Sequence, residues 1–171
     1  ALATAERAAR LAPSSGPAQR ALGDGRLYLA EHRRRLGEDS WPEVLAAFEA
    51  YRRAVELDPS YVKSYNGLGL ACIDRAEVEA NRGVDPSPTL STGIAALGRA
   101  VELVPGYTHA HNNQGILHRL RGEHAIRTGG DPRPALTAAA ESFARAIASN
   151  PSYTYAYNNL GNVHMMAAEY G

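Results

Sequence analysis

Apolar residues recur at intervals of three and four along most of the chain, which is the spacing of one face of an α-helix. In residues 44–57, for example, Val44, Ala47, Tyr51 and Ala54 follow this spacing. No stretch alternates β-branched and polar residues between hairpin turns, as a half-buried strand would. The pattern therefore predicts an all-α chain.

Several residue types recur every 46 positions, which indicates a repeat architecture. We call a set of residues of one type spaced by 46 positions a column. Because many columns share this spacing, the sequence predicts a solenoid whose units bury their apolar faces against one another. We expect one solenoid over residues 1–171, with about 3.7 units: 14–59, 60–105 and 106–151, and the partial units 1–13 and 152–171. The columns are Pro13, Pro59, Pro105 and Pro151; Gly23, Gly69, Gly115 and Gly161; Gly37, Gly83 and Gly129; Asp39, Asp85 and Asp131; and Tyr61, Tyr107 and Tyr153.

Each unit carries the start and stop signals of two helices, helix A and then helix B. The tyrosine column marks the start of helix A, and the glycine column at Gly83 and Gly129 marks its end. The aspartates are expected to cap helix B, which ends before the next proline of the first column. The predicted helices are 1–11, 15–36, 40–57, 61–82, 86–103, 107–128, 132–149 and 153–171.

These columns resemble the tetratricopeptide repeat, in which an aromatic residue, Leu-Gly and Tyr mark the first helix and Ala-x3-Phe and Pro mark the second. The resemblance implies a right-handed superhelix of helical hairpins that serves protein–protein interaction. First-helix positions are Tyr65, Leu68, Gly69, Cys72; His111, Gln114, Gly115, His118; and Tyr157, Leu160, Gly161, His164. Second-helix positions are Ala47, Tyr51, Ala54, Pro59; Gly93, Leu97, Ala100, Pro105; and Ala139, Phe143, Ala146, Pro151.

The units are about 12 residues longer than the family period of about 34. We assign the extra residues to an elongated helix A and a Gly-x-Asp-Pro-x-Pro loop at 83–88 and 129–134. Such long units look similar to regions appended to bacterial Ser/Thr protein kinases, and residues 157–162 are similar to the repeat region of O-GlcNAc transferases. Both likenesses imply a non-catalytic scaffold module in a larger bacterial signalling protein.

Charge and composition exclude several classes of partner. The 18 Lys and Arg residues balance the 18 Asp and Glu residues, so neither nucleic acid nor an acidic membrane surface is expected as a partner. No apolar run reaches the length of a membrane span, and no signal peptide is recognisable, so we expect a cytoplasmic location. Cys72 is the only cysteine, which excludes an intramolecular disulfide.

No catalytic or cofactor motif is present, so neither an enzyme activity nor a cofactor is expected; an unrecognised active site is the least favoured hypothesis. A metal site would need three converging ligands. His109 and His111 point to different sides of a helix, so a metal site is not expected. His118 and His164 are instead expected to replace the family tyrosine as packing residues, as Cys72 does in its unit. Residues Arg33 to Arg35 are expected to form a solvated helix end.

Function is expected on the exposed side of the A helices, which line the concave face of such stacks. By helical spacing, the residues assigned to that side include Gly67, Ile73, Leu120, Met165 and Met166, which are not among the residues expected to contact a peptide. The residues that we expect to contact a bound peptide are Lys63, Asn66, Leu70 and Asp74 in one unit, His109, Asn112, Asn113, Ile116 and Arg119 in the next, and Tyr155, Asn158, Asn159 and Asn162 in the last.

Asparagines form two columns on this side: Asn66, Asn112 and Asn158 in one, and Asn113 and Asn159 in the other. An asparagine amide both donates and accepts hydrogen bonds, so the columns are suited to pair with an extended peptide backbone. Alternatively, these amides serve the architecture by bonding to backbone between hairpins. The sequence leaves both interpretations open.

Two further alternatives concern partners. The Lys-Asn clamp with which some family members grip a carboxy-terminal carboxylate is not reproduced here, so binding of chaperone C-termini is not expected. The chain starts in a helix B and stops in a helix A. An alternative function is therefore a spacer or self-assembling array that stacks head to tail through these ends.

Overall fold

The computed structural model describes residues 2–170, whose regular structure is entirely helical. Within these residues the predicted all-α class is confirmed, and each predicted helix is present with ends within about three residues. Residues 1 and 171, which the predicted terminal helices included, lie outside the described part. The helices are α1 (Leu2–Leu11), α2 (Gly16–Arg35), α3 (Trp41–Leu57), α4 (Val62–Asn81), α5 (Ser87–Leu103), α6 (Thr108–Thr128), α7 (Arg133–Ser149) and α8 (Thr154–Ala168).

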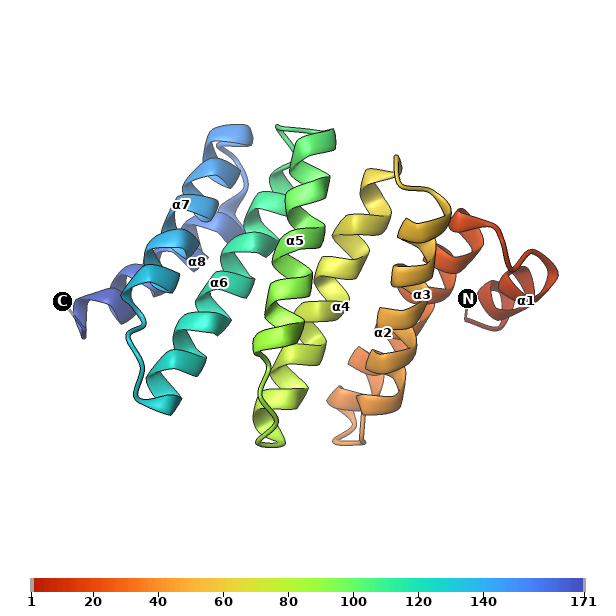
Figure 1. The fold of residues 1–171 in the computed structure, drawn as a ribbon, viewed down its shortest axis with the longest axis horizontal. Coiled ribbons are helices and arrows are strands. Elements are labelled where there is room, and N and C mark those ends of the chain that lie inside the picture. Colours follow the sequence, from red (N-terminus) through yellow and green to blue (C-terminus); the bar gives the residue numbers. More distant parts are fainter. Residues whose placement is uncertain (1, 171) are drawn as a thin grey trace.

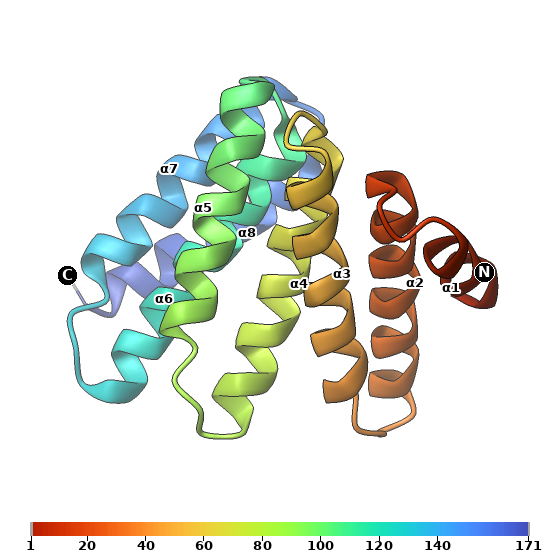
Figure 2. The same cartoon turned by 45° about the vertical axis from the view of Figure 1, so that its right-hand side comes forward.

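The helices form a row in which successive helices run antiparallel, and the connections alternate between the two ends of the helices (Figure 1). Helices α2, α4, α6 and α8 are the A helices, and α1, α3, α5 and α7 are the B helices. Each A helix contacts the next A helix, whereas the described residues of α3, α5 and α7 do not contact one another. The row therefore curves with the A helices on its inner side, and Figure 2 shows α1 at one end of the row.

The turns from helix A to helix B depend on one glycine and one aspartate per unit. Gly37, Gly83 and Gly129 have φ angles of 73°, 71° and 75°, a left-handed conformation that favours glycine. The aspartate carboxylates accept the first helical N–H: Asp85 Oδ1 lies 2.9 Å from Ser87 N. These aspartates stand one residue before the N-cap position, so the predicted capping is confirmed with a shift of one residue.

The core is organised by glycines on A helices that receive large side chains from B helices. A Cβ added at Gly69 would lie 2.6 Å from Leu97, and one at Gly115 would lie 2.5 Å from Phe143. Such distances are well inside van der Waals contact, so only glycine lets these side chains approach the helix backbone. In these units the glycine column therefore permits close packing between helix A and helix B.

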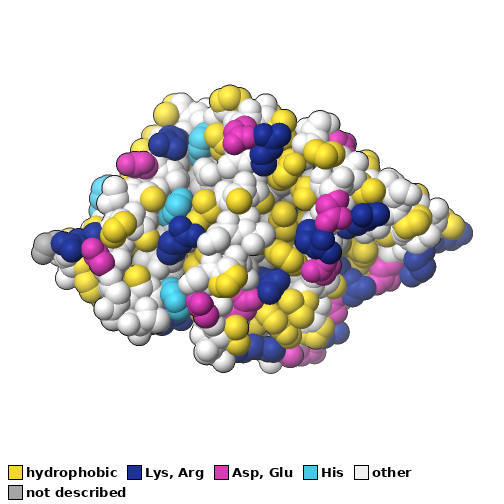
Figure 3. Space-filling model, in the orientation of Figure 1, with side chains coloured by type: hydrophobic (Ala, Val, Ile, Leu, Met, Phe, Trp, Pro, Cys, Tyr) yellow, Lys and Arg dark blue, Asp and Glu magenta, His cyan; other side chains and the backbone are white. Residues whose placement is uncertain are grey.

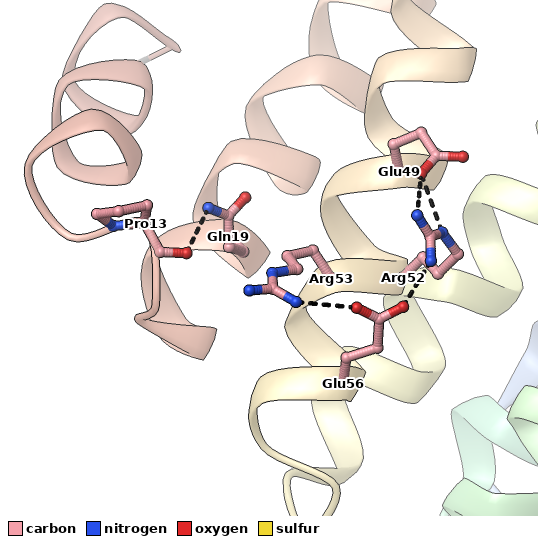
Figure 4. Close-up of polar contacts among 6 residues, drawn as sticks. All are labelled: Pro13, Gln19, Glu49, Arg52, Arg53 and Glu56. Atoms are coloured by element: carbon pink, nitrogen blue, oxygen red, sulfur yellow. Dashed lines mark hydrogen bonds and ion pairs between the residues drawn. The ribbon is translucent and has the colours of Figure 1, made fainter.

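The outer surface carries opposite charges next to one another (Figure 3). On α3, Arg52 bonds to Glu49 at 2.8 Å and to Glu56 at 2.5 Å, and Arg53 bonds to Glu56 at 3.1 Å (Figure 4). All four side chains are substantially exposed. Exposed pairs of this kind contribute little to stability, so the fold depends on its core.

A second contact that recurs from unit to unit closes the turn from helix B to helix A. Gln19, Tyr65 and His111, which are 46 residues apart, donate to the carbonyl oxygens of Pro13, Pro59 and Pro105. The donor–acceptor distances are 3.1, 3.2 and 2.8 Å, and Figure 4 shows the Gln19 contact. This position of the repeat therefore ties α2, α4 and α6 to the turn that precedes each of them.

A buried ion network holds the first three helices together. Glu43 of α3 is buried and lies 2.7 Å from Arg26 and 3.5 Å from Arg33, both on α2. Arg26 also bonds to Glu6 of α1 at 2.7 Å. Arg33 reaches toward α3 but keeps 36% of its side chain exposed, so the predicted solvated helix end is confirmed in part for this residue.

Among residues 2–170, no helix combines the length and the apolar character that crossing a bilayer requires.

Candidate functional site

The inner face formed by α2, α4, α6 and α8 carries the side chains predicted to contact a peptide. Lys63, Leu70, His109, Tyr155, Asn158 and Asn162 are exposed, and Asn66, Asp74, Ile116, Arg119 and Asn159 are half-buried. Asn112 and Asn113 are only 4% and 7% exposed. The predicted residues therefore lie on one face, but the exposure of their side chains to solvent differs.

Three residues assigned to this exposed side belong to the core instead. Ile73 and Leu120 are buried in the main apolar cluster, and Gly67 is covered by the ring of Tyr51. The expectation was wrong because the A helices are packed on both sides: the ring of Tyr51 from α3 covers Gly67, and Ile73 and Leu120 lie in the core cluster that several helices share. Met165 of α8 stays exposed, and Met166 is half-buried.

An amide ladder crosses the centre of the inner face from α8 to α4. Asn159 Nδ2 donates to Asn112 Oδ1 at 3.1 Å, and Asn112 Nδ2 donates to Asn113 Oδ1 at 3.3 Å. Asn113 Nδ2 in turn donates to Asn66 Oδ1 at 3.0 Å. The two columns thus join three A helices through side-chain amides, whereas the architectural alternative had expected backbone partners.

Aromatic rings form a row beside the ladder, at the start of α6 and α8. The ring centroids of Tyr107 and His109 are 5.9 Å apart, those of His109 and Tyr153 are 5.3 Å apart, and those of Tyr153 and Tyr155 are 5.6 Å apart. The first two contacts are edge-on, a favoured geometry for aromatic pairs. The sequence showed the tyrosine column, but it did not show that His109 contacts Tyr107 in its own unit and Tyr153 in the next.

Paired charges occupy the other end of the inner face, near the last turns of the A helices. Arg34 lies 2.9 Å from Glu31 on its own helix and 3.3 Å from Asp74 on α4. Burial raises the pKa of Asp74, and the Arg34 guanidinium partly opposes this rise. The side chains of Arg34 and Arg35 are 40% and 75% exposed, so the expectation of a solvated helix end is confirmed for both, although Arg34 also pairs with Asp74.

A small cavity continues this charged region between α4 and α6. Its volume is about 250 Å³, and its lining includes Glu77, Arg119, Glu123 and Arg127. Burial and then the nearby Asp74 carboxylate raise the pKa of Glu77. The glutamates Glu31, Glu77 and Glu123 are 46 residues apart, so repeat spacing could have marked them as one column of the inner face.

The packing residues predicted in place of the family tyrosine differ between units. Cys72 is fully buried, and burial raises the pKa of its thiol to about 12, so its structural role is confirmed. His118 is half-buried, and burial lowers the pKa of its imidazole. His164 is exposed, so the expectation is wrong there: no helix of the described residues follows α8 to cover it.

Among residues 2–170, no three His, Cys, Asp or Glu side chains are grouped so that they could hold a metal ion.

Comparison with known proteins gives matches at the level of structure alone. No family model matches the sequence, and no curated protein sequence matches it either. The crystal structure of MamA superposes with a TM-score of 0.66 at 20% identity, covering 98% of this chain and 77% of MamA.

Two further solved structures share the architecture. The second TPR domain of human RPAP3, in complex with the HSP70 peptide SGPTIEEVD, has a TM-score of 0.54 at 14% identity and covers 81% of this chain and 92% of that domain. TTC0263, a thermophilic TPR protein of Thermus thermophilus, has a TM-score of 0.52 at 18% identity and covers 96% of this chain and 89% of that protein. At these identities the likeness concerns the fold, and the fold of this chain is a solenoid of helical hairpins of the tetratricopeptide-repeat type.

Proposed function

We propose that this chain is a protein-interaction module whose inner face binds an extended peptide or an extended segment of a partner protein. The observation that carries the proposal is the row of asparagine amides across α8, α6 and α4, beside which Asn158 and Asn162 remain exposed. The proposal assigns no catalytic step and no cofactor to this face.

The buried and exposed asparagines have different tasks in this proposal. Asn112 and Asn113 hold each other and their neighbours in fixed orientations, so the ordering cost of those amides is met before a ligand arrives. Asn158 and Asn162 are exposed and present free amide groups along the same face. An amide pairs with peptide N–H and C=O groups whatever the side chains are, which suits recognition of an extended backbone.

The flanking groups would supply the specificity. Tyr155, which is 69% exposed, and His109 offer ring surfaces at one border of the ladder. At the other border, Arg34 and Arg119 are already paired with carboxylates of this chain. We therefore expect the ligand to present apolar or aromatic side chains to the rings rather than a free carboxylate to an arginine clamp.

The peptide-bound RPAP3 domain supports the class of function, because a hairpin solenoid of the same fold is seen there with the HSP70 peptide SGPTIEEVD. The wider setting rests on the resemblance of the long units to regions of bacterial kinases. We place the module in a larger bacterial signalling protein in the cytoplasm, acting as a scaffold, with neither nucleic acid nor a membrane as its partner.

Asn112 and Asn158 allow a matched test, because they occupy the same column in different surroundings. A peptide selected from a displayed random 12-residue library would serve as the probe. Asn158→Ala with Asn162→Ala should weaken binding of this peptide at least tenfold, with a stability change below about 0.5 kcal/mol. Asn112→Ala should instead cost about 1–3 kcal/mol of stability, because buried amide partners lose their hydrogen bonds.

The result would contradict the proposal if the selected peptide bound the Asn158/Asn162 double variant as tightly as wild type. Melting temperature and affinity would be measured on the same preparations. A matched control is Thr137→Ala, which changes an exposed side chain on α7, outside the inner face, and should leave both quantities unchanged.

The second candidate function is head-to-tail self-association. It is favoured by the exposure of apolar side chains at both ends of the row: Leu11 of α1 is 76% exposed and Met165 of α8 is 65% exposed. Sedimentation velocity between micromolar and millimolar concentration tests it. A purely monomeric protein over that range would exclude it.

A further inference from the structure

The aromatic row at the start of the A helices extends across three units. Burial and then the nearby Tyr61 raise the pKa of Tyr107, so the row continues from α6 to the start of α4. The Arg20 guanidinium lies 5.8 Å from the centroid of the Tyr61 ring and ends the row on the side of α2. The aromatic row consists of the tyrosine column, Tyr61, Tyr107 and Tyr153, and of two rings that stand two residues later in their units, His109 and Tyr155.

The repeat position two residues after each of these tyrosines faces solvent in every one of the three units. It holds Lys63 in α4, His109 in α6 and Tyr155 in α8, and all three are exposed. Helices α4 and α6 each contact an A helix on both sides. The exposure of this position is therefore a property of the repeat and does not depend on the end of the described chain.

The aromatic row repeats at the distance between neighbouring units. The ring centroids of Tyr107 and His109 are 5.9 Å apart and those of His109 and Tyr153 are 5.3 Å apart, so the two tyrosines are separated by no more than about 11 Å. Packed helices typically lie about 8–10 Å apart, which agrees with this bound.

A polyproline II helix has a matching period. It completes a turn every three residues, or about every 9.3 Å, whereas one face of a β-strand repeats after about 6.6 Å. A polyproline II segment that crosses the units would therefore present every third residue to the same position of each successive unit.

The chemistry of the aromatic row also favours proline. Ring faces are poor acceptors for backbone N–H groups, so a β-strand laid on them would bury unpaired donors. Proline has no N–H group, and polyproline II has no internal hydrogen bonds, so its carbonyl oxygens remain available as acceptors. Asn158 follows Tyr155 by three positions, which places the exposed Asn158 amide on the same face of α8 as a donor for such a carbonyl.

We propose that the aromatic row binds a proline-rich segment of a partner protein in the polyproline II conformation, with prolines packed on the rings of His109 and Tyr155. The inference rests on the proposed function, because it names the class of segment that the inner face takes. Aromatic surfaces bind proline-rich segments in several protein modules, where the preformed polyproline II helix loses little entropy on binding.

Decaproline labelled with fluorescein is the probe, and a ten-residue Gly-Ser peptide with the same label is its control. In fluorescence anisotropy we expect decaproline to bind saturably and at least about tenfold more tightly than the Gly-Ser peptide. His109→Ala with Tyr155→Ala should weaken the binding of decaproline at least about tenfold, a loss typical of truncated aromatic anchors. Tyr28→Ala, at a similarly exposed tyrosine outside the aromatic row, should leave the affinity unchanged.

Lys63 allows a test in the opposite direction, because it occupies in α4 the position that holds a ring in α6 and α8. Lys63→Tyr adds a ring and should strengthen the binding of decaproline at least about threefold, in line with the energy of one aromatic contact. Lys63→Ala removes the same charge without adding a ring and should not strengthen it.

The proposal is overturned if decaproline binds no more tightly than the Gly-Ser peptide, or if both the His109/Tyr155 double variant and Lys63→Tyr bind it as wild type does. The library-selected peptide separates this inference from the proposed function. If binding of that peptide depends on Asn158 and Asn162 but decaproline does not bind, only the assignment of a proline-rich ligand fails. If the selected peptide shows no such dependence and decaproline does not bind, both fail.

Discussion

The glycine column offers a pair of identical substitutions with opposite expected effects. Gly115 and Gly161 occupy the same position of helix A, but only Gly115 is covered by a large side chain. In Gly115→Ala the new methyl carbon would lie 2.5–2.7 Å from three ring atoms of Phe143. In Gly161→Ala it would meet nothing within 4 Å among the described residues.

The expected magnitudes follow from two opposing contributions. Alanine is favoured over glycine inside a helix by about 1 kcal/mol, which applies to both variants. Carbon atoms pack at about 3.5–4.0 Å, so the Phe143 ring must move by about 1 Å in a closed core, and overpacking of this kind costs about 1–3 kcal/mol. We therefore expect Gly115→Ala to lower the free energy of unfolding by up to about 2 kcal/mol and Gly161→Ala to raise it by about 0.5–1 kcal/mol.

Urea denaturation followed by circular dichroism measures both effects, and a change of 1 kcal/mol corresponds to a shift in Tm of about 2–4 °C for a chain of this length. Phe143→Ala removes the ring, so in that background Gly115→Ala should no longer destabilise the protein. The reasoning would be refuted if the two alanine variants shifted stability in the same direction, or if removing the ring left the effect of Gly115→Ala unchanged.

The remaining predictions concern the turns and the buried ions. Replacing Asp85 or Asp131 by Ala should lower the urea midpoint at pH 7. Hydrogen bonds to the carboxylates lower the pKa of both groups, so their contribution to stability is present above about pH 4. The midpoints of variant and wild type should converge as the pH falls through the lowered pKa. Arg26→Met should cost about 1–3 kcal/mol in the same assay because it leaves the buried Glu43 carboxylate short of a partner, whereas Arg35→Met removes only an exposed pair and should change stability by less than about 1 kcal/mol.

Much of the fold could be predicted because its signals act on local backbone. A glycine such as Gly83 ends a helix through its left-handed conformation, and Asp85 bonds to an amide two residues later. These effects need no tertiary partner, so the 46-residue spacing placed every helix of the described chain to within about three residues. The burial of apolar faces between units was likewise expected, because a repeat can bury its apolar face only against its neighbours.

The inner face could be predicted only in part. Repeat spacing correctly grouped Asn66, Asn112 and Asn158 on one side of the A helices. It could not show that Asn112 is buried while Asn158 is exposed, because burial depends on whether another hairpin follows. For the same reason His164 lacks the cover that Cys72 has, although both occupy one column.

The repeat unit, its two helices and the side of each helix that faces inward are encoded in the order of the amino acids, since they follow from local backbone preferences and helical periodicity. Packing between units then established which of the equivalent positions are filled, paired or open. Ile73 became a core residue through the approach of neighbouring A helices, and Asn113 reached Asn66 only because successive units curve toward one another. These outcomes depend on distances between units, which a column of identical residues does not encode.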